Sequence, residues 1–82
     1  MPTWLTSLIA WLMAESQTGI VATLQSEWAA VVAAQGVFAK AVAMAKLLMT
    51  AAQAFSTLPT PTNEPLHAKA VADFRSHFAI AA

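Results

Sequence analysis

The chain has 82 residues, with four basic and four acidic side chains, a formal net charge of zero and no cysteine. Hydrophobic residues make up 59% of it and charged residues 10%, whereas a typical soluble domain has about 25% charged residues. These values exclude intrinsic disorder, a disulfide or thiolate-metal scaffold, and a basic nucleic-acid-binding surface. The length predicts a single domain over residues 1–82.

The apolar excess predicts that the chain does not act alone. The first charged residue is Glu15, the next is Glu27, and no other follows until Lys40. A small domain buries only about 60–65% of the surface of its unfolded chain, so a lone copy would expose larger apolar patches than monomers usually tolerate. We therefore expect association with protein or contact with lipid. A monomer covered by alanine, which is only weakly hydrophobic, is the alternative.

Residues 1–18 predict a short helix that is apolar nearly all round. Trp4, Leu8, Trp11 and Leu12 follow helical spacing, and no charge interrupts them. Trp4 and Trp11 are candidate anchors at a membrane interface, although interfacial helices usually add basic residues and this stretch has none.

Residues 19–56 predict one long alanine-rich helix. A break at residues 15–19 precedes it, where Gly19 could supply a left-handed cap. The stretch contains no proline and repeats apolar residues at alternating three- and four-residue intervals, which is typical of a coiled-coil seam. We predict that this seam is an interface, formed by Leu24, Val31, Ala34, Phe38, Ala41, Ala45, Leu48, Ala52 and Phe55.

The remaining chain predicts a proline-rich connector over residues 57–65 and a C-terminal helix over residues 66–80. Asn63 is a candidate cap for this helix, and Lys69, Asp73 and Arg75 are expected to face water. The predicted fold is therefore all-α: a long central helix flanked by a short tryptophan-bearing helix and a C-terminal helix, arranged as a hairpin or small bundle.

The sequence offers little for catalysis or metal binding. His67 and His77 are ten residues apart on one predicted helix and point about 80° away from each other, so they do not form a metal-binding pair. Asp73 and His77 are spaced to pair on the helix surface. No serine has a nucleophile context, and no glycine loop could hold a phosphate. We expect no enzymatic activity, no catalytic residues, no metal site and no cofactor.

Membrane crossing by a single helix is unfavourable. The most apolar window, residues 28–48, is long enough, but it contains Gln35, Lys40 and Lys46. Each central lysine costs about 2.5–3.5 kcal/mol, whereas the larger apolar residues of the window together return roughly 3 kcal/mol. Insertion beside partner helices is still open.

The predicted function is a non-catalytic structural subunit. It would pack through the seam into a homo-oligomer, a filament or a larger protein complex, with no nucleic acid as partner. One alternative is a small accessory subunit of a membrane protein complex, and another is a carrier of an apolar ligand. The compartment is not predicted.

Overall fold

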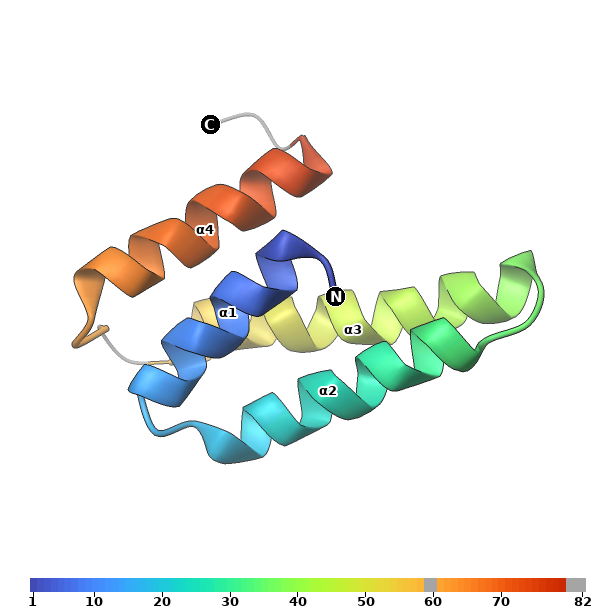
Figure 1. Cartoon of the computed structure of the whole chain (residues 1–82), viewed down its shortest axis with the longest axis horizontal. Helices are drawn as coiled ribbons and strands as arrows, with labels where there is room; N and C mark the ends of the chain where they lie inside the picture. Colours follow the sequence, from blue (N-terminus) through green and yellow to red (C-terminus); the bar gives the residue numbers. More distant parts are fainter. Residues whose placement is uncertain (59–60, 80–82) are drawn as a thin grey trace. The chain divides into compact units, whose positions relative to one another are not determined.

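The computed structural model describes residues 1–58 and 61–79, and this part of the chain forms four α-helices without a strand (Figure 1). The helices are α1 (Thr3–Ala14), α2 (Thr18–Ala33), α3 (Val37–Thr57) and α4 (Glu64–Phe78). The all-α prediction is confirmed, with its short tryptophan-bearing first helix, a long helix in the middle of the chain and a last helix after the proline-rich segment.

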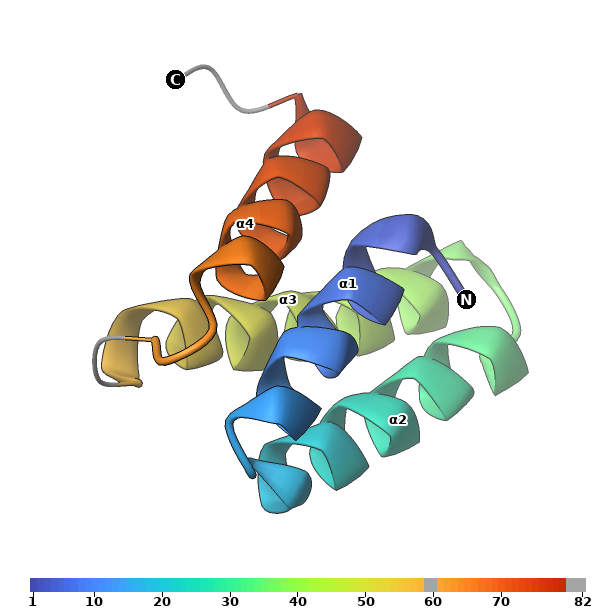
Figure 2. The same cartoon turned by 60° about the vertical axis from the view of Figure 1, so that its left-hand side comes forward.

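The four helices form two compact units, each built from two helices (Figures 1 and 2). One unit, the terminal pair, brings α1 from the start of the chain against α4 from its end. The other unit, the central hairpin, consists of α2 and α3, which follow each other directly in the sequence.

The helix predicted over residues 19–56 is interrupted, which corrects the predicted boundaries. It divides into α2 and α3 at residues 34–36, where Gly36 adopts a φ of 88°. Glycine reaches this left-handed region without a steric penalty, and α3 begins there with a hydrogen bond from the Lys40 N–H to the Gly36 carbonyl (3.2 Å). A glycine inside a helix costs only about 1 kcal/mol, which packing of the two arms can outweigh.

The end of α1 also differs from the expectation, because Gly19 is not the left-handed residue. Ser16 takes that role with a φ of 61°, and Gly19 lies in the first turn of α2. The N–H of Gln17 bonds the carbonyl of Leu12 (2.8 Å), and the N–H of Ser16 bonds that of Met13 (3.1 Å). This pair of bonds is a Schellman motif, which satisfies carbonyls that the end of the helix leaves open.

Aromatic rings hold the terminal pair together. Trp4 packs edge-on against Phe74 and Phe78 near the end of α4, with ring centroids 5.6 and 5.4 Å apart. Trp11 packs edge-on against His67 near its start, at 4.7 Å. The two helices therefore run in opposite directions. Each tryptophan is only 1% exposed, so these candidate membrane anchors lie in the core of this structure.

Candidate functional site

The structure divides the predicted seam between two environments. Leu24 and Val31, on α2, are buried within the protein. The α3 members are more accessible, because the turn at residues 34–36 reverses the chain and the seam is not one continuous face. Leu48 and Phe55 are half-buried, as is Ala34 in the turn, and Phe38, Ala41, Ala45 and Ala52 are exposed.

The exposed seam residues belong to an apolar face of α3, which we call the outer stripe. Its members recur at helical intervals and carry no charge, and the largest of them, Phe38, is 83% exposed. A helix face of this kind is normally covered in a folded protein. The outer stripe consists of Phe38, Ala41, Val42, Ala45, Met49 and Ala52.

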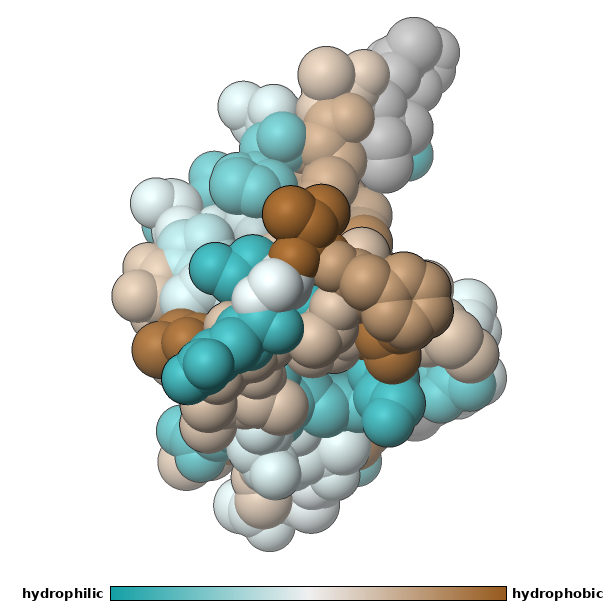
Figure 3. All heavy atoms as spheres, turned by 90° about the vertical axis from the view of Figure 1, so that its right-hand side faces the viewer, coloured by the Kyte–Doolittle hydropathy of each residue, from teal (hydrophilic) through white to brown (hydrophobic). Residues whose placement is uncertain are grey.

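A groove of about 390 Å³ lies beside the outer stripe, between α2 and α3. Its lining is mostly small and apolar, and Phe38 and Val42 of the stripe contribute to it. Glu27 and Lys46 are its charged members. Figure 3 shows the end of the molecule at which α2 turns into α3, where apolar side chains gather with hydrophilic ones around them. The hairpin thus presents a hollow and projecting apolar side chains together.

Glu27 has hydrogen-bonding capacity left at the edge of this groove. One carboxylate oxygen, Oε2, accepts a hydrogen bond from the Thr50 hydroxyl (3.0 Å). The other oxygen, Oε1, is covered and has no hydrogen-bond partner among the described residues. A hydrogen-bond donor or a cation that reaches this covered oxygen would stabilise the carboxylate.

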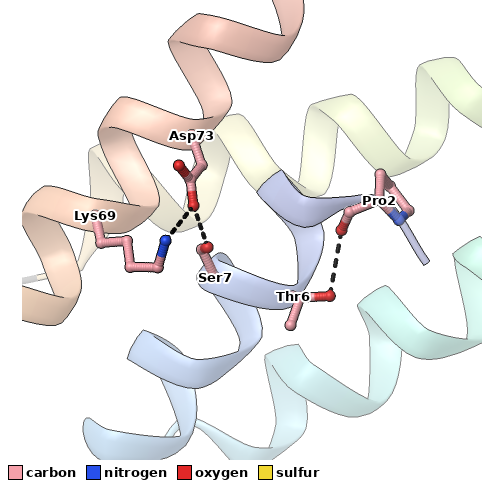
Figure 4. Close-up of polar contacts among 5 residues, drawn as sticks. All are labelled: Pro2, Thr6, Ser7, Lys69 and Asp73. Carbon is pink, nitrogen blue, oxygen red and sulfur yellow. Dashed lines mark hydrogen bonds and ion pairs between the residues drawn. The ribbon is translucent and has the colours of Figure 1, made fainter.

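The terminal pair contains a polar contact that sequence reasoning missed. Ser7, only 6% exposed, donates a hydrogen bond to Oδ2 of Asp73, and the Lys69 ammonium lies 3.0 Å from the same oxygen (Figure 4). These two partners, first the Ser7 hydroxyl and then Lys69, hold the pKa of Asp73 below its ordinary value. Asp73 was expected to face water and pair with His77, but its hydrogen bond from Ser7 joins α4 to α1, and its other partner is Lys69 of α4.

A second carboxylate, that of Glu15, caps the N-terminus of α4. Its Oε1 accepts hydrogen bonds from the backbone N–H groups of Thr62 (2.7 Å) and Asn63 (3.1 Å), and its Oε2 accepts one from the Thr62 hydroxyl (2.7 Å). Asn63 occupies the cap position, as predicted, but makes no capping bond with its own side chain. Glu15 supplies negative charge where a helix dipole favours it. The Thr62 hydroxyl is the largest cause of its lowered pKa.

These two carboxylates predict a loss of stability in acid. A lowered native-state pKa stabilises the fold above the ordinary values of 4.5 for Glu15 and 3.8 for Asp73, and this stabilisation disappears as the pH falls through the lowered values. We expect Glu15→Gln to lower the melting temperature at neutral pH. The melting temperature of this variant should also fall less than that of the unmodified chain when the pH is lowered. Thermal unfolding followed by circular dichroism across this range measures both effects.

The exposed Glu64, in the first turn of α4, provides the matched control. Glu64→Gln removes the same charge without touching the three hydrogen bonds, so its acid profile should stay close to that of the unmodified chain. Identical profiles for the Glu15 and Glu64 variants would contradict the capping role.

The histidines take part in ring packing. His67 lies against Trp11, and the ring centroid of His77 is 6.1 Å from that of Trp4. Across residues 1–58 and 61–79, no three histidine, aspartate or glutamate side chains are grouped so that they could hold a metal ion. The outer stripe with its groove is therefore the candidate site of this protein.

Comparison with known proteins identifies no relative. The chain matches no protein-family model, and neither a curated protein nor a solved structure is significantly similar to it. In length and composition, α3 is a helix that could cross a membrane, and only 17% of its most apolar window is buried within the protein.

Proposed function

We propose that this protein is a non-catalytic structural subunit that assembles with further copies of itself through the outer stripe of α3. The observation that carries the proposal is the exposure of an uncharged apolar face along a helix of 21 residues. Covering a phenylalanine side chain alone contributes about 1.5–3 kcal/mol. Association therefore covers apolar surface that a lone copy of this composition would expose to water.

The surroundings of the stripe favour protein over lipid as its cover. Lys46 flanks the stripe and is exposed, and Lys40 is exposed six residues earlier on the same helix. A protein interface leaves such charges at its solvated rim, whereas placing each of these lysines at the centre of a bilayer costs about 2.5–3.5 kcal/mol. Exposed polar residues of α2, among them Gln25 and Ser26, would also have to enter the lipid or be covered.

The accessory subunit of a membrane complex is the second candidate function. The length and apolar composition of α3 favour it, since these suit a membrane-crossing helix that partner helices cover.

Alkaline carbonate extraction of membranes from expressing cells separates the two candidate functions. We expect the chain in the supernatant after extraction, and we expect that it does not float with phosphatidylcholine vesicles in a density gradient. Retention in the carbonate-washed pellet would contradict the proposed function and support the membrane candidate. A known single-span membrane protein serves as the retained control in the same extraction.

A further inference from the structure

We infer that two copies pair antiparallel through the outer stripe, about a two-fold axis that passes between Ala45 and Met49. The inference rests on the proposed self-assembly and adds its geometry. A two-fold interface uses the same surface on both copies, so that surface must be complementary to itself. The stripe, the groove and the charges beside them can each be tested against that requirement.

The order of large and small residues along the stripe fits one antiparallel register. An axis midway between Ala45 and Met49 places Met49 of each copy opposite Ala45 of the other, and Val42 opposite Ala52. The same axis places Phe38 opposite Ser56, which is also exposed. Every large side chain then meets a small one, as closely packed helices require.

A parallel pair about a two-fold axis lacks this property. It would set each residue against its own copy, so that Phe38 meets Phe38 and Met49 meets Met49, while alanine faces alanine. Large residues would hold the helices apart and leave gaps between the alanines, and such gaps cost packing energy. The stripe therefore favours the antiparallel arrangement.

The charges beside the stripe fit the same axis. Glu27 and Lys46 line one groove and so lie along the same edge of the stripe. An antiparallel two-fold brings this edge of one copy against the same edge of the other. Glu27 is level with the Lys46–Thr50 turn, because Thr50 bonds its carboxylate. The axis places Lys46 of the second copy within about 3 Å of that level along the helix. Two opposite-charge pairs then form, and they give Glu27 a cation.

Cysteine cross-linking tests this register without background, since the chain contains no cysteine. Ala45→Cys and Met49→Cys are made as separate variants at exposed positions, mixed in equal amounts and oxidised. We expect the mixed disulfide, identified by its mass, to exceed the share that random pairing gives. Each variant alone should cross-link poorly, because its own cysteines are offset along the helices by about 6 Å.

Gln25→Cys mixed with Met49→Cys is the control, because Gln25 is exposed on α2 away from the stripe. Efficient cross-linking of Ala45→Cys with itself would overturn the inferred register. Absence of the mixed disulfide in a particle of several copies would overturn the inference and leave the proposed function standing. A particle of one copy would overturn both.

Charge reversal gives an independent reading of the same geometry. Glu27→Lys and Lys46→Glu should each weaken association, whereas an equal mixture should restore it, because opposite charges then meet in both pairs of residues 27 and 46. Repulsion inside one copy would persist in the mixture. A mixture as weak as its components would therefore overturn the proposed pairing of Glu27 with Lys46.

Discussion

Replacing Phe38 with aspartate is expected to reduce the native particle to single copies while the helical content stays unchanged. Phe38 is 83% exposed, so the substitution removes little from the folded chain itself. In the assembly it removes about 1.5–3 kcal/mol of burial from each copy and brings a carboxylate into an apolar contact. Two such losses correspond to a dissociation constant at least about 100-fold higher. Sedimentation over a dilution series measures the shift.

Gln25→Asp is the matched control for this variant. It adds the same charge at an exposed position of α2 outside the outer stripe. The control should assemble like the unmodified chain. If Phe38→Asp assembles equally well, the outer stripe is not the interface.

Replacing Trp4 with alanine is expected to have the largest effect on stability. Trp4 is 1% exposed and contacts the rings of Phe74 and Phe78, so its removal leaves a cavity between α1 and α4. Truncation of a buried aromatic residue costs about 3–5 kcal/mol, a large part of the roughly 5–15 kcal/mol that stabilises a domain. Urea unfolding followed by circular dichroism should show a much lower midpoint or an unfolded chain.

Met13 provides the control on the same helix. It is 53% exposed, so Met13→Ala should change the free energy of unfolding by no more than about 0.5 kcal/mol. A Trp4 variant as stable as the Met13 variant would show that the terminal pair does not rest on this aromatic contact. Because Trp4 lies outside the outer stripe, comparing Trp4→Ala with Phe38→Asp separates effects on folding from effects on assembly.

The helices could be predicted because their signals are local. The proline-rich segment ends α3, Pro65 stands in the first turn of α4, and the apolar spacing marks α1. The turn at residues 34–36 escaped prediction for the same reason. Alanine and glutamine favour helix, and one glycine weakens a helix only slightly, so the decision falls to contacts between α2 and α3 that no short window contains.

The polar contacts of the terminal pair lie beyond local reasoning altogether. Ser7 and Asp73 are 66 residues apart, and Glu15 reaches Thr62 across 47 residues. Helical spacing predicted that Asp73 lies beside His77, but only the packing of α1 against α4 offers it the Ser7 hydroxyl. Part of the outer stripe could be predicted from the sequence. Four of its six residues belong to the predicted seam, whereas Val42 and Met49 join them only once the helix has its observed orientation.

The native mass of the unmodified chain tests the central claim most directly. Light scattering coupled to size exclusion, in buffer without detergent, should give a multiple of the 8.6 kDa chain mass that falls on dilution. A compact particle of 8.6 kDa at every concentration, free of lipid, would contradict the account, because the outer stripe of α3 would then need no cover.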